Sequence, residues 1–288
     1  MSRVHDALRK AERSSNDGRE PAHREPVPVL RPADLGGLLS QVQDVPYTPA
    51  PGFHIIDPER PRDAQGEEFR TLRTRLNHLQ KLQGIRSVVI TSPCPAEGKS
   101  FTSVNLAVAE AQLANNPTLL ADFDFRRPTL HNTFQIDRSP GATDVMLGKA
   151  SLSEAIRRVS GTNLYLMPAG SAVLNPLEIL NLDETKSLLE RLPQVFSWVL
   201  LDSPPLLFAA DASLLATVAD GTILVVRIGV TTVDSVTRAI QSLCENNVLG
   251  IVANGARAGE LYSKYTYYYS SYYYKEKKSD GGEAEPSE

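Results

Sequence analysis

The chain has few of the features that mark secreted or membrane-spanning proteins. Its 288 residues include only two cysteines, Cys94 and Cys244, which lie far apart and lack the spacing of metal ligands. This pattern excludes a disulfide framework and is typical of a reducing compartment. No run of 18 or more apolar residues occurs, and no apolar stretch precedes a cleavage site near the N-terminus. We therefore expect no transmembrane helix, no signal peptide and a cytoplasmic location.

A strong charge of one sign is also absent. The net charge at pH 7 is −4, and charged residues make up 22% of the chain. Nothing in this balance indicates bulk binding of nucleic acid, and we expect no nucleic-acid partner. The length allows one large domain with a substantial core, or two small ones.

The first 62 residues are expected to lie outside the main core. Residues 1–13 form a candidate amphipathic helix whose small apolar face consists of Val4, Ala7, Leu8 and Ala11. Such a helix could dock on a partner, lie on a membrane surface or be a frayed terminus, and its small apolar face favours docking. Residues 14–62 are rich in Pro, Asp, Glu, Arg and Gly and predict a linker without a core.

From residue 63 to about 259, helical and strand-like segments alternate. Residues 62–82 have apolar side chains spaced by three and four, as in a helix. Aliphatic runs follow at 87–92, 118–124, 163–170, 198–205, 222–229 and 250–255. Helices are expected at 100–114, 151–158, 183–192, 211–219 and 232–245. Continuous aliphatic strands alternating with helices indicate the α/β class, with a mostly parallel β-sheet and helices on both faces.

A phosphate-binding loop is expected between the first aliphatic strand and the helix that follows it. The tripeptide Gly98-Lys99-Ser100 stands at this junction, where a helix N-terminus offers unpaired N–H groups to an anion. Lys99 could reach the β- and γ-phosphates of a nucleotide, and the Ser100 hydroxyl could ligate Mg²⁺. The usual GxxxxGK[ST] spacing would place a glycine at position 93, where Pro93 stands. The residues expected around the phosphates are Pro95, Ala96, Glu97, Gly98, Lys99, Ser100 and Phe101.

Three carboxylates are expected to meet this loop. Asp122 and Asp124 end the second aliphatic run, and Asp202 ends a later one. Ligands of open parallel sheets bind outside the carboxyl ends of the strands, so the three side chains should converge beside the loop. Carboxylate, hydroxyl and phosphate oxygens are the ligands that Mg²⁺ prefers, which predicts a P-loop NTPase-type site for Mg-ATP. Arg126 and Arg127 could steady a phosphate or form structural ion pairs, and both interpretations stay open.

The tyrosines of the chain are concentrated in one short segment. Eight of the ten fall within "YSKYTYYYSSYYY", namely Tyr262, Tyr265, Tyr267, Tyr268, Tyr269, Tyr272, Tyr273 and Tyr274. The segment lacks the pattern of a buried strand, and it continues into "KEKKSDGGEAEPSE", a composition typical of chains that do not fold alone. Residues 260–288 are therefore expected to form a flexible tail. The tail could be a sticky aromatic segment or a set of phosphate acceptors.

Together, these motifs resemble the bacterial tyrosine kinases, P-loop enzymes that autophosphorylate in exopolysaccharide and capsule production. Lys99 with Ser100, the segment "DFDFR" and the segment "DSPP" match the Walker A, A′ and B motifs of that family. The resemblance covers about residues 63–274 and includes the terminal tyrosines. It implies that Lys99 binds phosphate, that Ser100, Asp124 and Asp202 hold Mg²⁺, and that Asp122 accepts the proton of the incoming tyrosine.

The resemblance also implies partners. "EEFRTLR" is similar to the family's ExxRxxR motif, as Glu67, Arg70 and Arg73, and implies a ring of subunits that phosphorylate one another's tails. An intrahelical surface ion pair is the simpler interpretation of the same residues. A separate inner-membrane polysaccharide co-polymerase would recruit and activate the kinase, and a tyrosine phosphatase would reverse the reaction.

Two other functions stay open at this point. One is an ATPase switch of the partitioning or division-site class, which transfers no phosphate to tyrosine. Cys94 stands where those relatives carry a second signature lysine, which argues against this class. The other is a nucleotide-binding scaffold without activity, against which the complete set Lys99, Ser100, Asp122, Asp124 and Asp202 argues.

Overall fold

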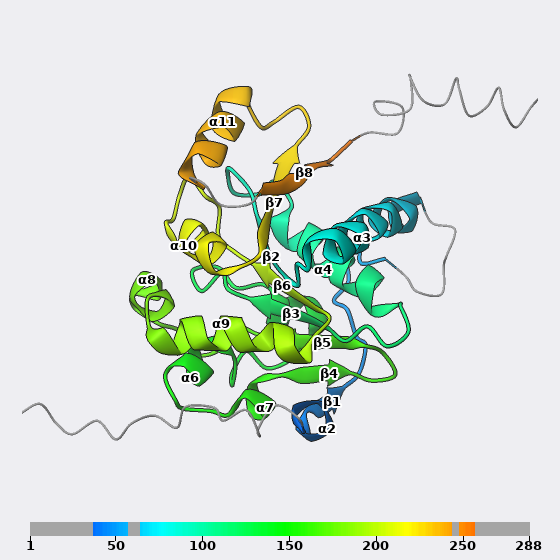
Figure 1. Cartoon of the computed structure of the whole chain (residues 1–288), viewed down its shortest axis with the longest axis vertical. Coiled ribbons are helices and arrows are strands. Elements are labelled where there is room, and N and C mark those ends of the chain that lie inside the picture. Colours follow the sequence, from blue (N-terminus) through cyan, green and yellow to red (C-terminus); the bar gives the residue numbers. More distant parts are fainter. Residues whose placement is uncertain (1–36, 57–63, 244–247, 257–288) are drawn as a thin grey trace, which may run out of the picture. The chain divides into compact units, whose positions relative to one another are not determined.

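An eight-stranded β-sheet organises the computed structural model (Figure 1). The structure describes residues 37–56, 64–243 and 248–256, all within one unit of the chain. The strands are β1 (Gln43–Val45), β2 (Ser87–Thr91), β3 (Thr118–Asp122), β4 (Arg157–Val159), β5 (Leu164–Met167), β6 (Trp198–Asp202), β7 (Gly221–Arg227) and β8 (Val248–Asn254). The six aliphatic runs of the sequence became β2, β3, β5, β6, β7 and β8. Strands β2, β3, β5 and β6 are buried on both faces, whereas the edge strand β8 is only partly buried.

The strand order is β1-β4-β5-β3-β6-β2-β7-β8. Neighbouring strands are parallel except for β4 and β5, which pair antiparallel. The expected mostly parallel α/β sheet is therefore confirmed. Because β3, β6 and β2 are adjacent, the residues that follow them come together at one edge of the sheet.

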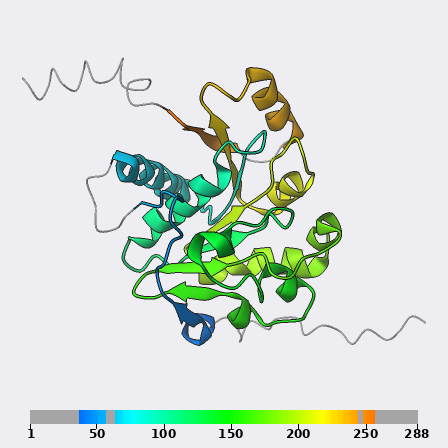
Figure 2. The same ribbon diagram turned by 180° about the vertical axis from the view of Figure 1, so that it is seen from behind.

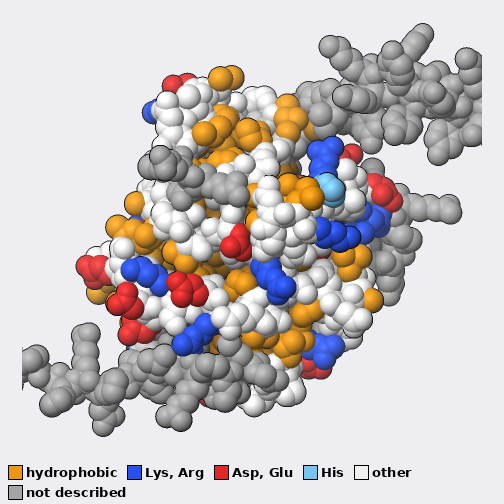
Figure 3. Space-filling view, viewed as in Figure 1, with side chains coloured by type: hydrophobic (Ala, Val, Ile, Leu, Met, Phe, Trp, Pro, Cys, Tyr) orange, Lys and Arg blue, Asp and Glu red, His pale blue; other side chains and the backbone are white. Residues whose placement is uncertain are grey.

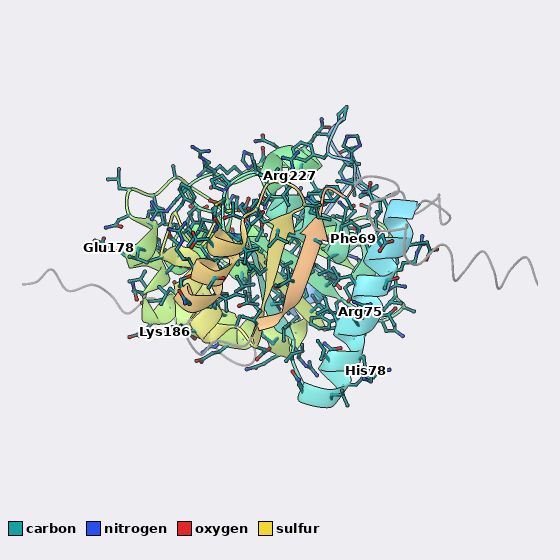
Figure 4. The ribbon with its side chains drawn as sticks, turned by 90° about the horizontal axis from the view of Figure 1, so that it is seen from above. Phe69, Arg75, His78, Glu178, Lys186 and Arg227 are labelled. Carbon is teal, nitrogen blue, oxygen red and sulfur yellow. The ribbon has the colours of Figure 1, made fainter. Side chains whose placement is uncertain are left out.

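Helices cover both faces of the sheet. They are α2 (Leu38–Gln41), α3 (Ala64–Gln83), α4 (Lys99–Ala111), α5 (Leu130–Phe134), α6 (Ala142–Met146), α7 (Leu152–Ala155), α8 (Pro176–Leu180), α9 (Asp183–Val195), α10 (Asp211–Val218) and α11 (Val233–Ser242). Helix α4 packs on β2, β3 and β6, and α3 packs on α4. Helices α9 and α10 pack on the opposite face, and in Figure 4 Lys186 of α9 lies on the other side of the sheet from Arg75 and His78 of α3.

The linker expected over residues 14–62 is wrong for residues 37–56. This part contains α2 and β1, and β1 extends the sheet by pairing with β4. The side chains of Leu38, Val45 and Ile56 are buried in the core. Local composition did not reveal β1 because the strand has three residues and only Val45 is buried, which leaves no apolar run to recognise.

The helix expected over residues 151–158 is also partly wrong. Only Leu152–Ala155 are helical, capped by Ser151, whose hydroxyl accepts a hydrogen bond from the Glu154 amide. Arg157–Val159 form β4 instead, between β1 and β5. The Arg157 guanidinium is buried and donates to the carbonyls of Pro140 and Ala155, a tertiary arrangement that local sequence does not encode.

The two expected terminal segments, residues 1–13 and 260–288, lie outside the described residues, as do the exact bounds of the 63–259 domain. No helix within the described ranges is both long and apolar enough to cross a membrane.

A buried carboxyl group joins α3 to α4. Glu110 accepts hydrogen bonds from the Asn77 and Asn116 amide groups, and the Trp198 indole donates to Asn77 Oδ1. Burial raises the pKa of Glu110 from 4.5 to about 7, although both amides favour the ionised form. The folded protein therefore keeps this proton through a pH window in which the unfolded chain has lost it.

This proton predicts a pH-dependent difference between the wild type and Glu110→Gln. Because the folded-state pKa is raised, the contribution of Glu110 to stability is lost as the pH rises from about 4.5 to about 7. Glutamine does not titrate. The free energy of unfolding of the variant, measured in urea, should therefore rise relative to that of the wild type between pH 5 and pH 8. The gain should be at most about 3 kcal/mol. The exposed Glu178→Gln serves as the control, and equal pH profiles for the wild type and Glu110→Gln would contradict the prediction.

Candidate active site

The phosphate loop connects β2 to α4 at the carboxyl edge of the sheet. Gly98 precedes the first residue of α4 and has φ of 100°, a conformation that favours glycine. A Cβ atom at this position would lie 1.8 Å from Asn254 Nδ2, at the end of β8. Glycine is therefore required here for both its backbone conformation and its lack of a side chain.

Residues from β7 and β8 fix the shape of this loop. The carboxylate of Glu97 is buried, accepts a hydrogen bond from the Cys94 amide at 2.7 Å and accepts another from the Thr231 hydroxyl. Asn254 Nδ2 donates to the Glu97 carbonyl at 3.0 Å, and Arg227 donates to the carbonyl of Ala96.

Sequence reasoning missed Arg227, Thr231 and Asn254. Only their positions in the sequence could have revealed them. These residues end or follow the aliphatic strands β7 and β8, and so lie at the edge of the sheet where ligands bind.

Lys99 lies between two carboxylates. Its Nζ atom donates to Asp124 Oδ2 at 2.8 Å and to Ser100 Oγ at 3.2 Å, and lies 4.0 Å from Asp202 Oδ1. Asp202 also accepts a hydrogen bond from the Ser103 hydroxyl at 3.1 Å. Four of the residues singled out in the sequence are thus brought together, although they come from three separate segments of the chain.

Burial and charge oppose each other in this cluster. Burial acts to lower the pKa of Lys99, but the carboxylates of Asp202 and Asp124 outweigh it and raise the pKa. Burial raises the pKa of Asp202, and the Lys99 charge only partly counteracts this effect. The Lys99 ammonium therefore supplies the positive charge that pairs with the buried carboxyl groups of Asp124 and Asp202.

Asp122 ends β3 and is fully buried. Its Oδ1 atom accepts a hydrogen bond from the Asp124 amide at 3.1 Å. Its Oδ2 atom accepts hydrogen bonds from the amides of Thr129 and Leu130, at 2.9 and 3.0 Å. Burial, and next the nearby charge of Asp202, raise the pKa of Asp122 to about 7. A carboxyl group that titrates near neutral pH is suited to exchange a proton with a substrate.

The two arginines after Asp124 differ in their contacts. Arg126 pairs with the buried Asp211 of α10, with Nη2 at 3.0 Å from Oδ2, which is the structural ion pair that the sequence left as one possibility. The backbone amide of Arg127 donates to Asp124 Oδ1 at 3.0 Å, while the Arg127 residue is exposed.

The motif on α3 divides between two environments. Arg70 pairs with Glu67 inside the helix at 2.6 Å, where the carboxylate side chain is 63% exposed. Arg73 instead donates to the Ala109 carbonyl of α4 at 2.7 Å. Lys and Arg side chains gather over this part of the surface in Figure 3, and Figure 4 shows Arg75 and His78 pointing away from the sheet. Glu67 is thus the exposed member of the motif, whereas the Arg70 side chain is only 21% exposed.

The donor set fits Mg²⁺ bound together with phosphate. In the described part of the chain, no three His, Cys, Asp or Glu side chains are gathered closely enough to hold a metal ion by themselves. Mg²⁺ does not require such a cage, because it keeps several waters and binds one or two carboxylates together with phosphate oxygens. Ser100, Asp124 and Asp202, which all lie around Lys99 Nζ, offer the hydroxyl and carboxylate oxygens that such an ion prefers.

Comparison with known proteins shows which family the chain resembles. No family model matches the chain. Tyrosine-protein kinase YwqD of Bacillus subtilis is 36% identical over 217 residues, which cover 75% of this chain and 91% of that protein. The putative tyrosine-protein kinase CapB of Staphylococcus aureus is 30% identical over 212 residues, which cover 73% of this chain and 92% of CapB. By contrast, the chain spans only 31% of the length of the putative tyrosine-protein kinase EpsB of Ralstonia solanacearum.

A solved structure gives the same result. The kinase domain of the Escherichia coli tyrosine kinase ETK superposes with a TM-score of 0.66 at 30% identity, covering 71% of this chain and 82% of that domain. Sequence identity at this level, over nearly the full length of YwqD and CapB, and the shared fold lead to one conclusion. The chain belongs to the bacterial tyrosine-protein kinase family.

Proposed function

We propose that this kinase uses Mg-ATP to phosphorylate the tyrosines of its own C-terminal tail, in trans within an oligomer, and thereby regulates exopolysaccharide or capsule production. The observation that carries the proposal is the cluster in which Lys99 contacts Asp124 and faces Asp202, with Asp122 on the adjacent strand end. These side chains lie at the carboxyl edge of the sheet, where ligands of this fold class bind.

The chain's own residues have distinct parts in the reaction. The loop amides and Lys99 bind and orient the β- and γ-phosphates, and Asp122 accepts the tyrosine proton as the oxygen–phosphorus bond forms and the bond from the γ-phosphorus to ADP breaks. Tyrosine has an ordinary pKa near ~10, so it needs such an acceptor at neutral pH. Mg²⁺ held by Ser100, Asp124 and Asp202 would neutralise the charge on the phosphates.

The tail is the better candidate for the acceptor because the two described tyrosines are packed. The ring of Tyr165 is buried against Phe196, with ring centroids 5.2 Å apart. The ring of Tyr47 is half-buried and lies 6.4 Å from the ring of Phe134. Neither side chain is presented as an exposed substrate would be.

We expect replacement of the eight tail tyrosines by phenylalanine to remove most phosphotyrosine. The full chain is incubated with γ-labelled ATP and Mg²⁺, and labelled tyrosines are mapped by mass spectrometry. Truncation after Gly259 should have the same effect and leave a folded core that binds ATP. Tyr47→Phe with Tyr165→Phe is the matched control and should keep nearly all labelling. Labelling mainly at Tyr47 or Tyr165 would overturn the assignment, and no phosphotyrosine at all in the wild type would favour an ATPase or a scaffold.

The oligomer is proposed to form through the Glu67–Arg70 pair on α3. The exposed Glu67 can reach a neighbouring subunit, and Arg70, which is 21% exposed, pairs with it. Arg73 is used within the chain, so Arg70→Ala should weaken assembly without loosening α3 from α4. Sedimentation before and after phosphatase treatment measures this, with Arg75→Ala on the same helix as the control. Each phosphotyrosine adds about −1.5 to −2 charges, so phosphorylated rings should separate by repulsion. A large species formed equally by Arg70→Ala would contradict the proposal.

A membrane partner follows from the same proposal. The chain superposes on the solved chimerical protein CapA2B2 with a TM-score of 0.67 at 25% identity, and this chimera supports a partner for the present chain. We propose a separate inner-membrane polysaccharide co-polymerase that recruits the kinase from the cytoplasm, and a tyrosine phosphatase that resets the tail.

A further inference from the structure

Residues 43–56 form a strap that joins the edge of the sheet to the helices around the active site. The strap starts at β1, and Figure 2 shows it in blue, running from this strand towards α3. The Val45 carbonyl accepts a hydrogen bond from the Ser160 amide beyond β4, and the Ile56 amide donates to Asn105 Oδ1 of α4 at 2.7 Å. Both ends of the strap are therefore fixed to the core.

The middle of the strap holds α5. The Ala50 amide donates to the Thr133 carbonyl at 2.9 Å, and the ring of Tyr47 contacts the ring of Phe134, which is almost fully buried. Helix α5 has only five residues, too few to be stable without tertiary contacts. The strap supplies two of these contacts.

The same short helix holds the carboxylate of Asp122. The amides of Thr129 and Leu130, at the start of α5, donate to Asp122 Oδ2. The Thr133 amide in turn donates to the Thr129 carbonyl at 2.9 Å, which links the end held by the strap to the end that binds Asp122. A continuous chain of hydrogen bonds thus connects Ala50 to Asp122.

We infer that the strap positions Asp122 for proton transfer, with Tyr47 and Ala50 as positioning residues that act through α5. This inference rests on the proposed function of Asp122 as the proton acceptor. Loosening the strap should move the Asp122 carboxylate away from the tyrosine hydroxyl and leave the phosphate loop, which is held by β7 and β8, unchanged. A displacement of about 1 Å in a reacting group can cost up to about a hundredfold in rate.

The test uses two variants of the full chain with different chemical changes. Ala50→Pro removes the amide proton that bonds Thr133, at a position already flanked by Pro49 and Pro51. Tyr47→Ala removes the ring contact with Phe134. Phe53→Ala, which truncates a side chain that is 39% exposed on the same strap, is the matched control.

Both variants should lower the rate of tail phosphorylation at saturating ATP by about tenfold and change the ATP dissociation constant less than twofold. Hydrogen exchange of residues 129–134 should become faster in both, while α4 stays protected. In combination with Asp122→Asn, Ala50→Pro should not lower the residual rate further, because the two changes act on the same group.

Other outcomes would overturn the inference or the proposed function. If Ala50→Pro and Tyr47→Ala transfer phosphate at the wild-type rate, or if ATP affinity falls as much as the rate, the strap does not position Asp122. A general loss of stability would make Phe53→Ala behave like Tyr47→Ala, and this too would overturn the inference. If the wild type itself forms no phosphotyrosine under the same conditions, the proposed function has failed instead.

Discussion

Lys99→Met is expected to reduce phosphotyrosine formation by about a thousandfold or more. Lys99 is the cation that lies between Asp124 and Asp202, and it is the residue proposed to face the β- and γ-phosphates. Methionine fills much of the same space without the charge, so the phosphates lose a fixed counter-charge. The two buried carboxyl groups lose theirs as well, and their ionised forms become costly to keep.

Two measurements examine this prediction. Labelling with γ-labelled ATP gives the loss of transfer, and thermal unfolding without nucleotide should show a loss of stability, because the buried Asp124 and Asp202 lose their partner. Lys186→Met is the matched control, because Lys186 pairs with Asp183 at 3.5 Å on the surface of α9 and should be dispensable for both. Labelling of Lys99→Met at the wild-type level would refute the role of Lys99 in phosphate binding.

Asp122→Asn should lower transfer by about a hundredfold to ten-thousandfold, the usual contribution of a positioned general base. Asparagine has nearly the same shape but does not accept the tyrosine proton. Both carboxylate oxygens of Asp122 accept backbone hydrogen bonds, so the NH₂ group of asparagine would replace one acceptor and meet a backbone N–H donor. A moderate loss of stability should accompany the loss of rate.

ATP binding separates catalysis from folding in this variant. If Asp122 acts on the tyrosine, Asp122→Asn should bind ATP with nearly wild-type affinity. Asp220→Asn is the control, because Asp220 Oδ2 accepts the amides of Arg86 and Ser87 at the opposite edge of the sheet. This control should lose some stability and keep transfer. Loss of ATP binding by Asp122→Asn would show that Asp122 organises the loop rather than accepting a proton.

The buried α/β core was accessible from the sequence because its signal is local. The runs that became β2, β3, β6 and β7 are continuously aliphatic, and only a sheet covered on both faces buries such strands completely. The positions of Lys99, Asp122, Asp124 and Asp202 at the carboxyl edge follow from the same pattern, since each lies at or next to the end of a strand or the start of the first crossover helix.

Tertiary structure alone decided how these groups are held. The strap over residues 43–56 has the composition of a linker, and its hydrogen bonds to Asn105, Thr133 and Ser160 reach residues 49 to 115 positions away in the sequence. The division of the α3 motif, with Arg70 paired to the exposed Glu67 and Arg73 bonded to α4, also depends on packing between helices. Residue type and spacing therefore determined which chemistry is present, whereas contacts between distant segments determined which of these groups pair with one another, which bond to a neighbouring helix and which are buried in the core.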